Sequence, residues 1–179
     1  MNELYYILHY CYGITAQKTI NGTEGLWSYR SVPSGGALYP LEIYLYMNNS
    51  VLNKGMYHYR PDLNALEIID DKDYIQEVRD NMVAEPYINI LSSSCIIFIS
   101  SVSERALLKY GERGYKFILQ EVGFVCQNIS LTCTAINLAS CMVGSFVDDR
   151  INEFIRADGT LETIQGIIII GKGKNDVIG

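Results

Sequence analysis

The chain has 179 residues, of which 49% are hydrophobic and 19% charged, and its net charge is −6. This length and composition suit a single domain, residues 1–179, with a buried core. The acidic balance and the scattered basic residues argue against a nucleic-acid partner. No apolar run reaches the roughly 18 residues that a membrane span requires, and the N-terminal segment lacks the basic region of a signal peptide. We therefore expect a cytoplasmic protein with no membrane partner.

The first predicted element is a helix over residues 2–12, whose apolar positions share one face and which ends at Gly13. Residues 14–29 are polar and contain glycine, and we expect an ordered loop there. Residues 41–47 alternate between two sets of side chains, which predicts a half-buried strand. One set is Leu41, Ile43, Leu45 and Met47, and the other is Glu42, Tyr44 and Tyr46.

The middle of the chain mixes strand and helix patterns. Apolar runs at 56–59 and 65–69 flank turn residues, which predicts a β-hairpin. Residues 71–92 are interpreted as one or two helices interrupted near Pro86. Residues 94–102 are apolar and rich in β-branched side chains, which indicates a buried strand.

The C-terminal half contains the longest helical pattern, residues 113–139, which follows a short helix or loop at 104–110. The apolar stripe of the long helix is broad enough to place it centrally or in a subunit interface. A short strand or loop at 141–146, a helix at 148–156 and a buried strand at 163–173 complete the series. Strands and helices alternate without strict βαβ order, which indicates the α+β class. The stripe comprises Phe117, Ile118, Val122, Val125, Cys126, Ile129, Cys133 and Ile136.

Cysteine and histidine usage argues against a metal site. The five cysteines form no CxxC pair and mostly lie in apolar runs, which indicates reduced core residues in a cytosolic protein. His9 and His58 lie far apart, and we interpret both as structural. We therefore expect no bound metal.

Residues 166–172 match the opening of a phosphate-binding P-loop, G-x-x-x-x-G-K. However, Gly173 stands where a serine or threonine should hold magnesium, and four isoleucines of a buried strand occupy the loop. We therefore reject nucleotide hydrolysis. Lys172 and Lys174 follow the strand end, where they can meet a phosphate, although solvated lysines are commoner.

Lys109 and Tyr110 are a second candidate for chemistry. A neighbouring ammonium favours the phenolate form of a tyrosine, so such a pair can act as a general base. The alternative, which composition alone favours, is that Tyr110 packs while Lys109 stays in solvent. We expect Glu104, Glu112 and Glu121 to be helix-surface charges.

The segment before the strand at 41–47 has an unusual sequence, RSVPSGGALYP, over residues 30–40. Gly35 and Gly36 permit backbone angles and close approaches that other residues do not, and the prolines at 33 and 40 stiffen both ends. Local sequence favours a tight loop that feeds the strand. The alternative is a loop shaped to hold a flat or anionic ligand.

Three blocks together resemble one family. Residues 30–45 are similar to the motif R-x-x-P-S-[AG]-G-[AG]-L-Y-P-x-E-x-Y of SagB-type dehydrogenases, a branch of the flavin-dependent nitroreductase superfamily. Residues 55–66 resemble the G-x-Y-H-Y-x-P hairpin of that family. Residues 109–146 resemble its helix beginning K-Y-G-x-R-G-Y, together with the strand that follows. The resemblance extends from about Leu4 to Lys172.

The resemblance implies a nitroreductase-like α+β fold, with a mixed, mainly antiparallel sheet flanked by helices and a long central helix at the dimer interface. It also implies FMN bound at the interface of a homodimer, next to the Pro-Ser-Gly loop. Lys109 and Tyr110 match the pair that azoline-oxidising members use to remove a proton, and Gln127 would support the site. The implied FMN-binding residues are Arg30, Pro33, Ser34, Gly35, Asn128, Met142, Val143, Gly144 and Lys172.

The activity that this resemblance favours is FMN-dependent oxidation of azolines to azoles in modified peptides. One alternative is a general NAD(P)H-dependent reductase of nitro or quinone compounds. Family members usually carry an arginine-rich segment that precedes the helix matching residues 2–12 and grips the FMN phosphate. This sequence begins at that helix, so we expect weak FMN binding or substitution by other residues. This departure motivates a third reading, an FMN-free scaffold subunit of a peptide-modifying complex.

Overall fold

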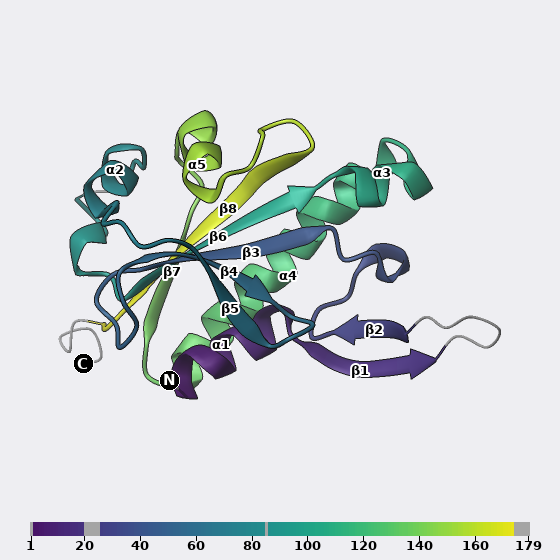
Figure 1. The fold of residues 1–179 in the computed structure, drawn as a ribbon, viewed down its shortest axis with the longest axis horizontal. Helices are drawn as coiled ribbons and strands as arrows, with labels where there is room; N and C mark the ends of the chain where they lie inside the picture. The colour runs from purple at the N-terminus through teal and green to yellow at the C-terminus, as the bar shows by residue number, and fades with distance from the viewer. Residues whose placement is uncertain (1, 20–25, 85, 174–179) are drawn as a thin grey trace.

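The computed structural model describes residues 2–19, 26–84 and 86–173. A six-stranded sheet runs through the middle of the molecule, and helices lie on both of its faces (Figure 1). The elements in chain order are α1 (Asn2–Tyr12), β1 (Ile14–Thr19), β2 (Leu26–Arg30), η1 (Gly35–Ala37), β3 (Leu41–Met47), β4 (Gly55–Arg60), β5 (Ala65–Asp70), α2 (Ile75–Asp80), η2 (Ile90–Ser92), β6 (Cys95–Val102), α3 (Glu104–Tyr110), α4 (Arg113–Ala135), β7 (Ala139–Val143), α5 (Asp148–Ile155) and β8 (Glu162–Gly171).

The strand order in the sheet is β5-β4-β3-β6-β8-β7, and every pairing between these strands is antiparallel. Buried side chains of α1 and α4 form one hydrophobic cluster with the sheet, and those of α2 and α5 form a second cluster on the opposite face. The expected α+β class is therefore confirmed, as are the predicted hairpin, β4–β5, and the buried strands β6 and β8.

The central strand β3 keeps the predicted alternation but not the predicted half-burial. Leu41, Ile43 and Leu45 enter the cluster under α1 and α4, whereas Tyr44 and Tyr46 enter the cluster under α2 and α5. Tyr46 is fully buried because its hydroxyl donates to Asp73 at 2.6 Å. A tyrosine can therefore line a core when its polar end reaches a partner.

Residues 14–29 do not form the expected loop. β1 and β2 pair as a two-stranded antiparallel ribbon, which stands off the main sheet (Figure 1); residues 20–25 between them lie outside the described residues. Most side chains of the ribbon are exposed. Apolar alternation predicts strands that bury one face, and a ribbon of this kind buries neither.

The predicted helices are observed with shifted ends. Of residues 71–84 and 86–92, which the structure describes, helix is found in α2 and the short turn η2 alone, and α4 ends at Ala135 rather than at residue 139. The main chain leaves the helix at Asn137, whose φ of 60° is left-handed. The Leu138 N–H then donates to the Cys133 carbonyl at 2.8 Å, as in a helix-ending motif of the Schellman type.

The cysteines match their predicted role as core residues, with one exception. All five are free, and Cys11, Cys95, Cys126 and Cys133 are buried, whereas Cys141 on β7 is exposed. Among the described residues, no helix is both long enough and apolar enough to cross a bilayer.

Candidate active site

The segment between β2 and β3 is a compact loop with unusual backbone angles. Gly36, Ala37 and Tyr39 have φ values of 63°, 54° and 46°. Left-handed angles are uncommon for residues with a Cβ and cost roughly 1–2 kcal/mol each. The Tyr39 N–H donates to Ser34 Oγ at 2.9 Å, which ties the two ends of the loop together. The surrounding contacts thus hold this loop in a strained shape, as is common at functional sites.

Lys109 and Tyr110, the predicted catalytic pair, meet this loop. A Cβ atom placed on Gly36 would lie 2.6 Å from Tyr110 Oη and 2.7 Å from Lys109 Nζ. Both polar groups therefore rest against the Gly36 main chain, and a larger residue at this left-handed position would have to displace them. The Tyr110 ring packs edge-on against Phe117 of α4, with centroids 5.0 Å apart. Tyr110 thus packs against its neighbours while its hydroxyl and the Lys109 ammonium converge on one point.

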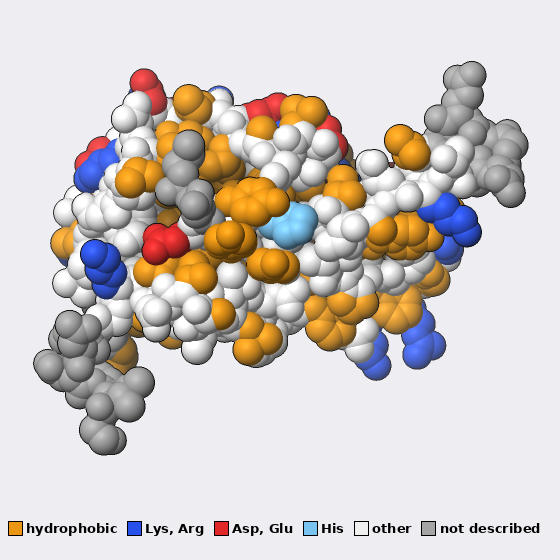
Figure 2. All heavy atoms as spheres, turned by 90° about the horizontal axis from the view of Figure 1, so that it is seen from below, with side chains coloured by type: hydrophobic (Ala, Val, Ile, Leu, Met, Phe, Trp, Pro, Cys, Tyr) orange, Lys and Arg blue, Asp and Glu red, His pale blue; other side chains and the backbone are white. Residues whose placement is uncertain are grey.

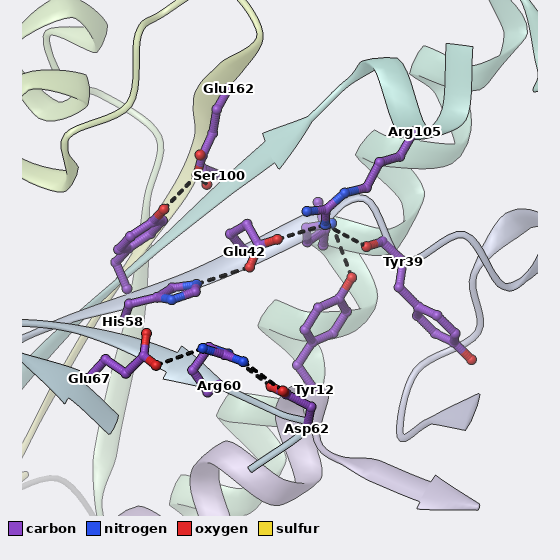
Figure 3. A network of polar contacts seen from close by, with 12 residues as sticks. Tyr12, Tyr39, Glu42, His58, Arg60, Asp62, Glu67, Ser100, Arg105 and Glu162 are labelled. Atoms are coloured by element: carbon purple, nitrogen blue, oxygen red, sulfur yellow. Dashed lines mark hydrogen bonds and ion pairs between the residues drawn. The ribbon is translucent and has the colours of Figure 1, made fainter. Parts of the chain in front are cut away.

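A polar network on the face of the sheet opposite α4 attaches α3 to the start of β3 (Figure 3). Arg105 Nη1 lies 2.6 Å from Glu42 Oε1 and 3.3 Å from the Tyr39 carbonyl oxygen, to which it donates. The other Glu42 oxygen lies 3.0 Å from His58 Nε2. Burial alone would raise the pKa of Glu42, but the bonds from His58 and Arg105 and the Arg105 charge outweigh it and lower that pKa. His58 thus helps to hold Glu42, and its structural role stays a prediction.

A second network lies on the α4 face, and it is centred on Glu121. This side chain is only 1% exposed, so the prediction of a helix-surface charge was wrong. Glu121 accepts a hydrogen bond from Tyr12 Oη at 2.8 Å, and Tyr12 Oη in turn accepts from the Leu41 N–H at 3.1 Å. Burial raises the pKa of Glu121, although hydrogen bonds from Ser34 and Tyr12 and the charge of Arg30 oppose the rise. The only sequence signal for this burial is that Glu121 lies within the apolar stripe, directly before Val122.

Arg30 lies beside the same network. The guanidinium carbon of Arg30 is 4.1 Å from the centroid of the Tyr12 ring and 5.0 Å from that of Tyr39. The main-chain N–H of Arg30 donates to Tyr39 Oη at 3.0 Å. Within the described residues, Arg30 forms no ion pair at 4.0 Å or less. The stacked guanidinium braces the base of the loop, and its predicted contact with FMN remains a prediction.

The side chain of Asn128 also supports the segment between β2 and β3 through hydrogen bonds. Its side-chain amide donates to the Tyr10 carbonyl at 2.9 Å and to the Ser31 carbonyl at 3.5 Å, so it joins α4 to the end of α1 and the start of the loop. Gln127, on the other hand, is exposed. Pro33 is exposed and Ser34 and Gly35 are partly buried, which leaves one side of the loop open to solvent.

The remaining predicted FMN-binding residues lie in a second group, on and beside β7. Met142 is 50% exposed, and Val143 is buried. β7 is the last strand in the order of the described sheet, so no described strand pairs with its outer side. Gly144 follows it, and an added Cβ there would meet no atom within 4 Å. The edge therefore offers open main chain to a flat ligand.

Lys172 lies at the other end of the β7–β8 pair, since Ala139 is the partner of Gly171. It borders a hollow of about 380 Å³ that also touches Ser93, Ser140 and Cys141. The Ser93 hydroxyl is buried and has no hydrogen-bond partner among the residues that the structure describes. An ammonium group and an unpaired hydroxyl at one hollow fit an anionic group such as a phosphate. The residues present are thus compatible with FMN along β7, with its phosphate at Lys172.

The predicted site residues consequently form two groups within one chain. The loop from Pro33 to Gly36 meets Lys109 and Tyr110, whereas Met142 to Gly144 and Lys172 lie along the β7–β8 pair. In Figure 1, α3 and the end of β8 lie on opposite sides of the molecule. Within the described residues, no group of three or more histidine, cysteine, aspartate or glutamate side chains is placed to hold a metal ion.

A comparison with family models identifies the protein family. The model described as "Nitroreductase family" matches residues 18–172. A Methanocaldococcus jannaschii protein assigned as a nitroreductase, MJ1384, is 32% identical over 157 residues, which cover 87% of this chain and 74% of that protein. The microcin B17-processing protein McbC of Escherichia coli is 31% identical over 140 residues, 72% of this chain and 49% of McbC.

Solved structures agree on the fold. A crystal structure of an assigned nitroreductase from Anabaena variabilis superposes with a TM-score of 0.87 at 24% identity, covering 94% of this chain and 34% of that chain. A chain of the E. coli microcin synthetase McbBCD complex with truncated pro-MccB17 gives 0.77 at 23% identity, covering 97% of this chain and 64% of that chain. The nitroreductase-like fold is therefore confirmed, and the present chain spans about half of McbC.

Proposed function

Because the chain belongs to the nitroreductase family, we propose that it is an FMN-dependent oxidoreductase of the SagB type, which oxidises azolines to azoles in modified peptides. The observation that carries this proposal is the contact of Lys109 and Tyr110 with Gly36. Two groups able to exchange a proton converge on a strained loop that is open on one side. A reductase that moves hydride between nicotinamide and flavin needs no such base.

The peptide substrate is supported by the similarity to McbC, a protein named for processing microcin B17. A structurally similar chain belongs to a complex that contains truncated pro-MccB17. By analogy, we propose that this chain acts on a modified peptide and works with partner proteins. The free cysteines support a cytoplasmic location, in which thiols stay reduced.

The proposed chemistry divides between the cofactor and the chain. FMN, when bound, supplies the acceptor for the hydride equivalent and is reoxidised by oxygen or another acceptor. Tyr110 or Lys109 removes the proton from the azoline ring carbon, and the pair can share that proton as a coupled unit. Lys172 would hold the FMN phosphate, and Met142, Val143 and Gly144 would line its ring. Arg30 and Asn128 would act by bracing the loop.

The separation of the site residues into two groups supports a homodimer. The loop of one chain would complete the β7 site of a second copy, as the resemblance implies. A large apolar surface is available for such contact, because hydrophobic side chains gather on the face seen in Figure 2. The exposed apolar residues of the paired helices α1 and α4 are Tyr5, Tyr6, Tyr10, Tyr115, Leu119, Phe124 and Leu131.

A second candidate, an NAD(P)H-dependent reductase of nitro or quinone compounds, is favoured by the similarity to MJ1384, which covers more of this chain than McbC does. A structural neighbour from Staphylococcus epidermidis carries the name NAD(P)H:FMN oxidoreductase, at a TM-score of 0.58 and 15% identity. Bleaching of bound flavin by NADPH without peptide would support this candidate.

The variants Lys109→Ala and Tyr110→Phe test the proposal. Each is expected to lower azoline oxidation by about 10²–10⁴-fold, the usual contribution of a general base, while bound flavin and its reduction by dithionite remain. Lys116→Ala is the matched control for Lys109→Ala, since its side chain on α4 is exposed and lies outside the proposed pair. Full turnover in both test variants would favour the reductase. Purified protein without visible flavin absorbance, even after incubation with FMN, would favour an FMN-free scaffold.

A further inference from the structure

The pair Lys109–Tyr110 sits at the end of α3, a helix of only seven residues. Most of this helix is exposed, and Ala106 is its one buried residue. Ala106 packs against Gly114 so closely that a Cβ on Gly114 would lie 2.8 Å from the Ala106 main chain. This contact fixes the spacing between α3 and α4. It does not fix the spacing between α3 and the loop that carries Gly36.

That second spacing depends on Arg105, which lies one helical turn before Lys109. Its guanidinium bridges two elements, because it donates to the Tyr39 carbonyl at the loop end and pairs with Glu42 on β3 (Figure 3). Tyr39 is itself joined to Ser34 across the loop. One side chain of α3 therefore holds both the strained loop and the strand that follows it.

Glu42 is in turn held in place. Its second oxygen lies 3.0 Å from His58 Nε2 on β4, and the His58 ring packs on Tyr44 with centroids 4.8 Å apart. The Glu42 side chain is 17% exposed, whereas that of Arg105 is 41% exposed. A carboxylate fixed by a neighbouring strand and shielded from water is a suitable anchor for a more exposed arginine.

We propose that Arg105, anchored by Glu42, is a positioning residue that sets the distance between the Gly36 loop and the Lys109–Tyr110 pair. This inference rests on the proposed function, because it assigns Arg105 and Glu42 a role in the same proton transfer. Neither residue touches the reacting atoms in this scheme. Loss of the bridge would let α3 move away from the loop while its contact with α4 remained.

The first experiment does not depend on activity. The full chain is treated with acetic anhydride, and the acetylation rate of Lys109 is measured by mass spectrometry, with Lys116 on α4 as internal reference. Arg105→Ala should change the Lys109 rate severalfold and leave Lys116 unaltered. Arg150→Ala is the control variant, because within the described part of the chain Arg150 pairs with Glu153 on α5 and with no other residue. An unchanged Lys109 rate in Arg105→Ala would overturn the inference.

The second experiment measures turnover of an azoline-containing peptide by the FMN-loaded protein. A displacement of about 1 Å at a catalytic group can cost about 10²-fold, so Arg105→Ala should lower kcat by up to that factor with little change in KM. Added guanidinium ion should restore part of the loss, because it can refill the place beside Glu42. Glu42→Gln should give a smaller loss of kcat, and it replaces Arg105→Ala in both experiments if that variant fails to fold.

The two experiments separate the inference from the proposed function. A raised KM with unchanged kcat in Arg105→Ala would mean that Arg105 binds substrate directly, which would overturn positioning. If the unmodified protein does not oxidise azolines, the proposed function fails, and the acetylation result still decides whether Arg105 positions Lys109.

Discussion

Two carboxylates lie near the start of β3 on opposite faces of the sheet, and their surroundings shift their pKa values in opposite directions. Glu42 has two partners that can carry positive charge, Arg105 and His58, and its pKa is lowered. Glu121 has two hydroxyl donors and, within the described residues, forms no ion pair, and burial raises its pKa. The surroundings thus stabilise the charged form of Glu42 on one face and destabilise the charged form of Glu121 on the other.

The two networks also hold the two halves of the candidate site in place. The network around Glu121 fixes the loop through Ser34, and the network around Glu42 fixes α3 through Arg105. The contact between Gly36 and the Lys109–Tyr110 pair is the point where the two networks meet. One network is buried and built mainly from hydroxyl groups, and the other is ionic and partly open to water. We therefore expect substitutions and changes of pH to affect the stability contributions of the two networks differently.

The largest effect should come from Glu121→Ala, which removes the acceptor for the hydroxyl groups of buried Tyr12 and partly buried Ser34 and leaves a cavity. We expect a loss of about 2–4 kcal/mol in the free energy of unfolding, measured by chemical denaturation. Gln120→Ala, one residue earlier and exposed, is the control. Equal losses in the two variants would mean that the inner network contributes no special stability.

Glu42→Gln should have the next largest effect. It removes the charge that binds Arg105, and because Arg105 is partly exposed we expect a loss of only about 1–2 kcal/mol at neutral pH. The lowered pKa of Glu42 means that its contribution is complete above the unfolded value near 4.5 and is lost as the pH falls through the folded value. The difference from the unmodified protein should therefore shrink on acidification, and a constant difference would contradict this assignment.

Glu121→Gln should have a smaller effect with the opposite pH trend. A raised folded pKa means that the contribution of Glu121 is complete below the unfolded value near 4.5 and is lost as the pH rises through the folded value. The amide keeps an acceptor oxygen without the charge. Relative to the unmodified protein, the variant should therefore gain stability between weakly acidic and alkaline pH. Measured by denaturation at several pH values, the stability difference from the unmodified protein should vary below about pH 4.5 for Glu42→Gln and above it for Glu121→Gln.

Arg150→Ala gives the smallest expected effect and calibrates the others. Its ion pair with Glu153 joins two side chains that are 60% and 67% exposed. Such pairs contribute little, so the free energy of unfolding should change by no more than about 0.5 kcal/mol. A loss as large as that of Glu42→Gln would mean that exposed and partly buried ion pairs contribute equally to the free energy of unfolding of this protein.

Much of the fold could be predicted because its signals are local. The alternation of residues 41–47, the turn between β4 and β5 and the isoleucine run of β8 each specify an element within a few residues. The burial of both faces of β3 could not be seen in the same way, since it depends on α2 and α5, which are distant in sequence. The β1–β2 ribbon lacked the apolar alternation that marks a half-buried strand.

The site was predictable only in part for a related reason. The motif around Gly36 and the Lys109–Tyr110 pair indicated the residues, but no local pattern placed them in contact. Glu121 was missed because its partners, Tyr12 and Ser34, lie 109 and 87 residues away in sequence (121 − 12 and 121 − 34). A carboxylate on a helix is usually solvated, and only tertiary contacts distinguish the exception.

The position of β8 has a consequence for synthesis on the ribosome. β8 follows β6 and β7 in sequence but lies between them in the sheet. While the chain is being made, β6 lacks one of its neighbours and β7 lacks its pairing partner in the described sheet until β8 has left the exit tunnel. One edge of the apolar strand β6 is therefore unpaired during that interval, and chaperones that bind extended apolar segments would find it there.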